Sequence, residues 1–221
     1  MKNTSENVSA DGICLQVFGE LGASVTHEIK NTLSIINENA GLLEDLCGIA
    51  EEGAGVPVEH VDAAAKKVMK QVERSNTVLK NLNRFAHSGD KIPAQADLHD
   101  ILSLMVTLTG RFAAMRKISV TLNCSAGMEV RTNLLAFNSL VFATLRRMYS
   151  ACPESSILEI VGESDGAGGV KIRFIPAKDA VSDCGCYPDL QEQILAAETG
   201  AVCRKQGAVI VIGLTAGPAT S

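Results

Sequence analysis

The stretch from Ser24 to Leu33 carries residue types that can do chemistry at a useful spacing. It reads Ser-Val-Thr-His-Glu-Ile-Lys-Asn-Thr-Leu, with His27 followed directly by Glu28 and, four residues on, by Asn31. Residues four apart share one face of a helix. An exposed imidazole near neutral pH keeps a free ring nitrogen and can act as a nucleophile. The spacing therefore makes His27 a candidate catalytic nucleophile.

The neighbours of His27 suggest supporting roles. Glu28 can accept a hydrogen bond from the second ring nitrogen and favour the reactive tautomer, and Asn31 can orient a water or a phosphoryl oxygen. Ser34 continues the polar stripe of His27 and Asn31, and Lys30 adds a positive charge. We take His27, Glu28 and Asn31 as candidate catalytic residues, and Lys30 and Ser34 as candidate phosphate- or partner-binding residues.

A simpler interpretation of His27 stays open, and a metal site is the weaker alternative. A lone His on a helix surface is most often only solvated. A helical zinc site would need a second His at position 31, where Asn31 stands, so no metal site is expected there.

The elements that must position these residues are two long helices. The first is predicted from residue 12 to about 47, because apolar or small residues recur in steps of three and four without a proline. Glycines and Pro57 end it, and a second helix is predicted over 58–86. The seam of this second helix alternates four and three, which is typical of a coiled coil: Val61, Ala65, Val68, Val72, Ser75, Leu79, Leu82, Ala86.

Two long helices with a short connection fold back as an antiparallel hairpin. A single hairpin leaves apolar stripes uncovered, so a homodimer that forms a four-helix bundle is expected. Packing of the hairpin on its own second domain is the alternative.

The second half has a mixed pattern. Helices are predicted over 98–115, 133–150 and 190–198, and strands over 118–123, 157–162, 170–175 and 208–214. Strands with helices on one side form a two-layer α/β sandwich. We predict a flexible N-terminus (1–11), a helical hairpin (12–88), a linker (89–97) and an α/β domain (98–221), an α + α/β fold.

Composition narrows the function classes. Hydrophobic residues make up 46% of the chain, enough to build a core and to exclude a disordered protein. The net charge of −5, without a run of Lys or Arg, argues against nucleic acid as a partner. Without an apolar N-terminal or membrane-spanning stretch, a cytoplasmic protein with no membrane partner is expected. Its seven cysteines then read as reduced thiols, and Cys184 and Cys186 as incidental loop thiols rather than a metal site.

The stretch around His27 resembles the phosphoacceptor motif of two-component histidine kinases, which reads His-Glu-hydrophobic-Lys/Arg-Asn-Pro-Leu. The chain matches it at His27, Glu28, Ile29, Lys30, Asn31 and Leu33. Thr32 stands where that family has proline, and we expect this change to alter local bending rather than acceptor chemistry. The resemblance implies that the hairpin is a dimerisation and histidine-phosphotransfer domain. It implies reversible phosphorylation of His27, a base or hydrogen-bond role for Glu28, and a phosphatase role for Asn31.

The second half resembles the ATPase domain of that family in layout, but not in its nucleotide-binding residues. Alignment on Ala151-Cys152-Pro153 places Ala143 and Arg147 where the family has magnesium-binding asparagines, and Arg cannot coordinate Mg²⁺. After the strand 170–175, residues 176–181 lack the Asp-x-Gly-x-Gly that holds adenine, and the glycines of 166–169 read as a hairpin turn. We expect a degenerate ATPase-like domain, with no ATP, other cofactor or metal bound by this chain.

These expectations combine into a histidine phosphotransfer protein of a phosphorelay, similar in architecture to dimeric bacterial phosphotransferases. Its partners would be receiver domains of response regulators, which supply Mg²⁺, and a sensor kinase as a further partner. Arg146 and Arg147 could form a phosphate or acidic-partner patch, although exposed charge is the simpler explanation. Two other functions stay open: a divergent sensor kinase or phosphatase, and a non-catalytic dimeric regulator that binds a kinase or a receiver.

Overall fold

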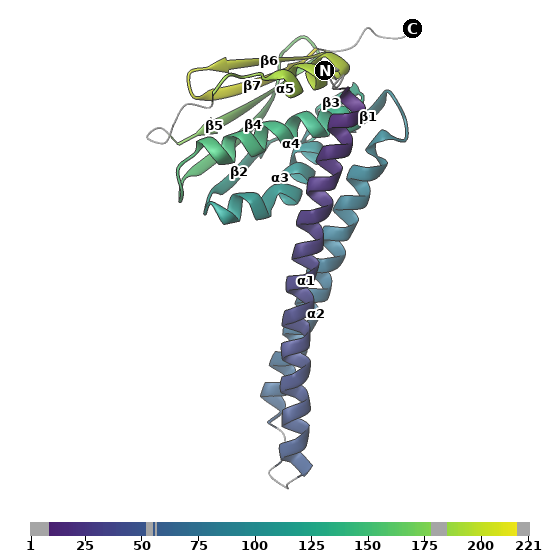
Figure 1. Cartoon of the computed structure of the whole chain (residues 1–221), viewed down its shortest axis with the longest axis vertical. Coiled ribbons are helices and arrows are strands. Elements are labelled where there is room, and N and C mark those ends of the chain that lie inside the picture. Colours follow the sequence, from purple (N-terminus) through teal and green to yellow (C-terminus); the bar gives the residue numbers. More distant parts are fainter. Residues whose placement is uncertain (1–8, 52–54, 56, 178–184, 216–221) are drawn as a thin grey trace, which may run out of the picture. The chain divides into compact units, whose positions relative to one another are not determined.

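The structure is a computed structural model that describes residues 9–51, 55, 57–177 and 185–215. Its contacts divide the chain into two compact units: Gly22–Leu82, and Met1–Leu21 together with Asn83–Ser221. The elements are drawn in Figure 1. The expected flexible terminus, 1–11, lies mostly outside the described residues.

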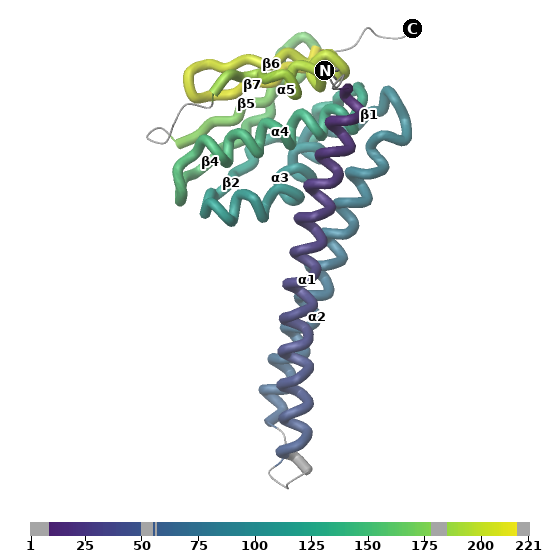
Figure 2. The backbone as a smooth tube through the Cα atoms, viewed as in Figure 1, coloured from purple at the N-terminus to yellow at the C-terminus, as the bar shows by residue number. Residues whose placement is uncertain are grey.

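The first unit is an antiparallel helical hairpin, built from the greater part of α1 (Ala10–Glu51) and α2 (Val58–Ala86). The two helices run side by side as coiled tubes in Figure 2. The predicted bounds of α2 are confirmed, and α1 is a few residues longer at each end than predicted. The hairpin interior contains Val25, Ala64 and Val78, each at most 8% exposed, together with the hydroxyl of Thr32.

The predicted seam of α2 divides between two faces. Val68, Ser75 and Leu82 are half-buried on the side that faces α1. Val72 and Leu79 are 40% and 46% exposed on the adjacent side. A seam of this width serves two neighbours, as a helix in a four-helix bundle requires, whereas one hairpin covers only half of it. The four-helix dimer itself stays a prediction.

The second unit contains a five-stranded sheet with strand order β2-β4-β5-β7-β6. Its strands are β2 (Ser119–Cys124), β4 (Ile157–Ser164), β5 (Val170–Pro176), β6 (Ala201–Gln206) and β7 (Val209–Leu214). The β2–β4 pair is parallel and the other pairs are antiparallel. A separate two-stranded sheet pairs β1 (Ala94–Asp97) with β3 (Glu129–Thr132), and a 3₁₀ turn spans His87–Gly89.

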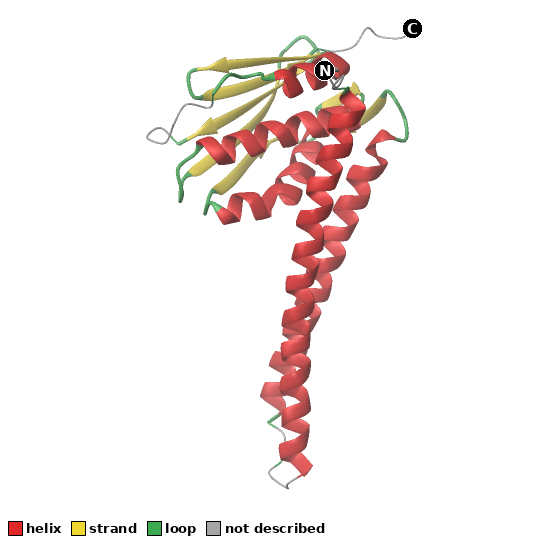
Figure 3. Ribbon diagram, in the orientation of Figure 1, coloured by secondary structure: helices red, strands yellow, loops and turns green. Residues whose placement is uncertain are grey.

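Three helices cover one face of the five-stranded sheet, as Figure 3 shows. They are α3 (Leu98–Met115), α4 (Leu134–Ala151) and α5 (Leu190–Thr199). Alternate strand residues point into this layer, so β5 shows strict alternation of buried and half-buried positions. The centre of the core is fully buried at Leu102, Phe137, Leu140, Leu145, Leu158, Ile160, Ile172, Phe174, Ile210, Ile212. The predicted two-layer α/β sandwich is confirmed.

Three strands were not predicted. β1 lies in the segment expected to be a linker, because Ala-Gln-Ala-Asp has no strand propensity of its own and pairs only through β3, where Ala94 lies opposite Thr132. β6 is an edge strand with exposed Val202 and Arg204, which hides the usual apolar pattern.

The start of α1 belongs to the sandwich unit. Ile13, Val17 and Leu21 are at most 5% exposed there, and the Phe18 ring stacks on Phe85 with centroids 6.5 Å apart. Among the described residues, no helix is both long and apolar enough to cross a membrane.

Candidate functional site

The predicted site residues lie on α1 within the hairpin unit. His27, Lys30, Asn31 and Ser34 are exposed. The cause is the helical period: Val25 and Thr32 are at most 4% exposed and face α2, which turns the polar residues between them toward solvent. His27 and Asn31 lie one turn apart on this exposed face of α1, so an approaching partner can reach both side chains. The Ser34 hydroxyl donates a hydrogen bond to the Lys30 carbonyl (3.1 Å).

Glu28 differs from the other predicted residues because it is held by α2. Arg74 Nε donates to Glu28 Oε1 at 2.9 Å, and Arg74 Nη2 lies 2.9 Å from the same oxygen. The side chain of Glu28 is 22% exposed, against 59% for Arg74. Glu28 therefore lies against the neighbouring helix, while His27 is exposed to solvent. The sequence did not lead us to Arg74. Its positive charge was the signal that could have indicated an ion pair with a carboxylate of α1.

Thr32, the residue in place of the expected proline, is buried at 1% exposure. Its hydroxyl donates to the Ile29 carbonyl (2.8 Å), and its Oγ1 lies 2.7 Å from Ser75 Oγ of α2. Back-bonding of this kind satisfies a Thr hydroxyl inside a helix, and α1 continues unbroken through this position. The sequence predicted Ser75 as a residue of the α2 seam, but it did not predict the contact between Ser75 and Thr32.

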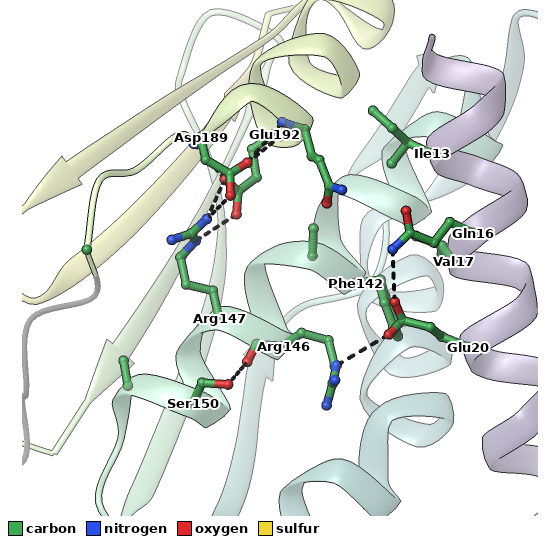
Figure 4. Close-up of a pocket in the computed structure, with 14 residues that line it drawn as sticks. Ile13, Gln16, Val17, Glu20, Phe142, Arg146, Arg147, Ser150, Asp189 and Glu192 are labelled. Atoms are coloured by element: carbon green, nitrogen blue, oxygen red, sulfur yellow. Dashed lines mark hydrogen bonds and ion pairs between the residues drawn. The ribbon is translucent and has the colours of Figure 1, made fainter. Parts of the chain in front are cut away.

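A second polar cluster lies in the sandwich unit, where Arg147 of α4 meets the start of α5 (Figure 4). Arg147 Nε is 2.7 Å from Glu192 Oε1, Nη2 is 2.9 Å from Glu192 Oε2, and Nη2 also contacts Asp189. Asp189 is the N-cap of α5, and its carboxylate accepts from the amides of Gln191 and Glu192. The cluster thus joins one cation to two carboxylates and to a helix start.

Burial separates the two carboxylates of this cluster. Glu192 is 2% exposed, and this burial raises its pKa although Arg147 is in contact. Partial burial also acts against the ionised form of Asp189. Hydrogen bonds from Glu192 and the charge of Arg147 outweigh it, so the pKa of Asp189 is lowered. The contacts with these two carboxylates leave the Arg147 side chain only 19% exposed.

The two positions expected to carry asparagine, Ala143 and Arg147, line a cavity of about 530 Å³ in this unit. On its other side Glu20 lies 3.7 Å from Arg146 Nε, and the Arg146 guanidinium lies 4.1 Å from the centre of the Phe112 ring. The patch expected from Arg146 and Arg147 is therefore divided, since each Arg faces its own acidic partners.

Other predicted features have mixed outcomes. The glycines of 166–169 form the expected turn between β4 and β5, with positive φ at Gly166 and Gly168. Cys184 and most of 176–181 lie outside the described residues, while Cys186 is exposed. Within the described part of the chain, no group of three His, Cys, Asp or Glu side chains could hold a metal ion.

At the level of sequence, no family model and no curated protein matches the chain. Solved structures do resemble it. The histidine kinase AdeS of Acinetobacter baumannii is 13% identical over 86% of this chain and 97% of its own, with a TM-score of 0.44. A bacterial phosphotransferase is 15% identical over 90% and 95%, with a TM-score of 0.45. The catalytic domain of histidine kinase ThkA is 12% identical over 57% and 97%, also with a TM-score of 0.45.

The solved structures that it resembles are histidine kinases and a phosphotransferase. A helical hairpin followed by an α/β sandwich was expected from the periodicity of the sequence, and the structure has both parts. At these identities and TM-scores, the neighbours say nothing about which residues of this chain act.

Proposed function

We propose that this chain is a histidine phosphotransfer protein of a two-component phosphorelay. The observation that carries the proposal is the exposed pair His27 and Asn31, one turn apart on a helix whose other face is held by α2. A nucleophile on a rigid, accessible helix can meet a partner's reactive group without rearrangement. The partner class is a receiver domain that carries an aspartyl phosphate and its own Mg²⁺.

The transfer step needs only an imidazole nitrogen without a proton. Its lone pair forms the N–P bond, the P–O bond to the receiver aspartate breaks, and the carboxylate leaves with that electron pair. The proton on the second ring nitrogen passes to water, to which His27 is open. The reverse step returns the phosphoryl group to the aspartate of another receiver.

The neighbouring side chains take separate tasks in this proposal. Lys30 offers a positive charge to the incoming phosphoryl group, and Ser34 adds a hydroxyl at the edge of the contact surface. Asn31 orients a water for hydrolysis, which is a different task from nucleophilic attack. Removal of Asn31 should therefore act on phosphatase activity rather than on transfer.

The sandwich unit is proposed not to bind ATP. Arg147 stands where a magnesium-binding asparagine was expected, and both nearby carboxylates, Asp189 and Glu192, are in contact with this Arg. An arginine has no acceptor for a metal ion, so this set of side chains does not fit Mg²⁺-ATP. Calorimetry with Mg-ATP should show no saturable heat. A micromolar dissociation constant would favour a divergent kinase instead.

A homodimer through the hairpin belongs to the same proposal. Five large exposed apolar side chains lie on the described part of α2 within the hairpin unit: Val58 (79%), Val61 (37%), Met69 (68%), Val72 (40%) and Leu79 (46%). A stripe of this kind on a polar helix is covered by a second helical layer, and a second copy of the chain supplies one by symmetry.

The test of the function is a labelling experiment. The protein is incubated with a panel of phosphorylated receiver domains, and acid-labile, base-stable label on the chain is measured. His27→Gln keeps polarity and approximate size but removes the nucleophilic nitrogen, so it should abolish labelling while receiver binding persists. Label that persists in the His27→Gln protein would assign the acceptor to another residue. Absence of label in the wild type, with receiver binding retained, would favour the non-catalytic regulator.

A further inference from the structure

The carboxylate next to the proposed nucleophile is bound by the other helix of the hairpin. Two nitrogens of the Arg74 guanidinium, Nε and Nη2, each lie 2.9 Å from Glu28 Oε1. Because both nitrogens meet the same oxygen, the guanidinium anchors that oxygen of Glu28 against α2 by charge and by hydrogen bonding. Because the Glu28 side chain is only 22% exposed, water screens this contact less than it would a fully exposed ion pair.

The register of the two helices holds Arg74 in this position. Ser75 follows Arg74 on α2, and Thr32 follows Glu28 by one turn on α1. Ser75 Oγ and Thr32 Oγ1 are 2.7 Å apart, and Thr32 is 1% exposed. A slip of the helices would leave the half-buried Ser75 hydroxyl without this partner, which is costly. The hydroxyl pair therefore keeps the guanidinium opposite Glu28.

We propose that Arg74 is a positioning residue that holds the Glu28 carboxylate against α2 and away from the His27 imidazole. His27 then reacts as a free imidazole rather than as a carboxylate–imidazole pair. The proposal rests on the proposed role of His27 and differs from the expectation that Glu28 would accept a hydrogen bond from the ring.

This arrangement favours one class of phosphoryl donor. An acyl phosphate has a carboxylate as its leaving group and reacts with an unassisted imidazole. A less reactive phosphoanhydride gains more from a base that takes the ring proton. With Glu28 held by Arg74, the site suits acyl phosphates such as the aspartyl phosphate of a receiver domain.

The test reads the tautomer of His27 in the full-length protein without any phosphoryl donor. Nitrogen-15 shifts of the ring distinguish the two tautomers, and the tautomer follows the hydrogen bond made by the second nitrogen. The His27 signals are identified by their loss in His27→Gln. In Arg74→Ala the released carboxylate should bind the Nδ1 proton, so the Nδ1 signal moves toward the protonated position and the Nε2 signal toward the unprotonated one. Arg74→Gln, which keeps side-chain length and helix propensity, should give the same shift.

Two controls make the result specific. Arg74→Ala with Glu28→Ala should return both nitrogen signals to the wild-type positions, because no hydrogen-bond acceptor is left at position 28 to bind the ring. Lys70→Ala removes an exposed cation one turn away on α2 and should leave the signals unchanged. Wild-type signals in both Arg74 variants would overturn the proposal. So would a shift that persists in the double variant or an equal shift in Lys70→Ala. None of these results depends on whether His27 becomes phosphorylated.

Discussion

Thr32 Oγ1 and Ser75 Oγ lie 2.7 Å apart between the two helices of the hairpin, although 43 positions separate the residues in the sequence. Thr32 stands where the histidine kinase motif has a proline, which has no hydroxyl. The pair is therefore a polar contact that the proline of that motif could not make, placed one turn from Glu28.

Removal of one hydroxyl of this pair should destabilise the hairpin. Thr32→Val leaves the part-buried Ser75 Oγ without this partner, a loss of about 1–3 kcal/mol. Urea unfolding followed by helical circular dichroism measures it. The double variant Thr32→Val with Ser75→Ala should lose less than the sum of the two single losses, because neither hydroxyl is then left unsatisfied.

The matched control for this prediction is Thr77→Val. Thr77 is exposed on α2 and donates only to the Glu73 carbonyl (3.0 Å). The change should shift stability by no more than about 0.5 kcal/mol. Equal losses for Thr32→Val and Thr77→Val would mean that the buried pair adds nothing.

The exposed stripe of α2 predicts how the dimer can be broken. Val72→Glu with Leu79→Glu places two charges where a second copy is proposed to pack, and a buried unpaired charge is strongly unfavourable. Sedimentation should show a dimeric wild type and a monomeric double variant that keeps its helical content. Thr77→Glu, away from the stripe, should remain dimeric. A monomeric wild type would contradict the prediction.

Asn31→Ala should separate two activities of the proposed site. Phosphoryl transfer to His27 from a receiver should continue, because the nucleophile is untouched. Loss of receiver phosphate to water in the presence of the protein should slow, because no amide orients the water. Time courses of both reactions with one phosphorylated receiver give the comparison. A parallel loss of both activities would instead place Asn31 in the transfer step or in receiver binding.

The lowered pKa of the Asp97 carboxylate should make the stability of the protein depend on pH. This carboxylate accepts hydrogen bonds from the Gly127 and His99 amides, which lower its pKa. A carboxylate with a lowered folded-state pKa contributes stability above its unfolded-state pKa, and this contribution is lost as pH falls through the folded-state value. Asp97→Asn keeps a cap for α3 but does not titrate.

Thermal melts from pH 7 down to pH 3 test whether the stabilising contribution of Asp97 is lost as the pH falls. The melting temperature of the Asp97→Asn protein should fall less over this interval than that of the wild type. Glu154→Gln, an exposed carboxylate, serves as the control and should follow the wild type. An Asp97→Asn curve parallel to the wild-type curve would show that the two amide contacts do not favour the ionised form.

The sequence predicted those elements whose signals are local. α3 begins where predicted because Asp97 is a good N-cap and an apolar stripe follows it. β1 and β3 were missed because they exist only through their mutual pairing. At the candidate site, the exposure of His27 and Asn31 followed from helical periodicity. The contact between Glu28 and Arg74 depends on the register of two helices, which the sequence of the turn does not determine.

The cluster around Arg147 opposes the introduction of a metal-binding residue at this position by a single substitution. Arg147→Asn would supply the residue type that the histidine kinase resemblance expects. It would also leave Glu192, at 2% exposure, without its cation and remove a contact from the cap of α5. Loss of one partner of a buried ion pair commonly costs about 3–5 kcal/mol. This one substitution would therefore weaken the fold before it created a metal ligand, so the acidic partners of Arg147 act against it.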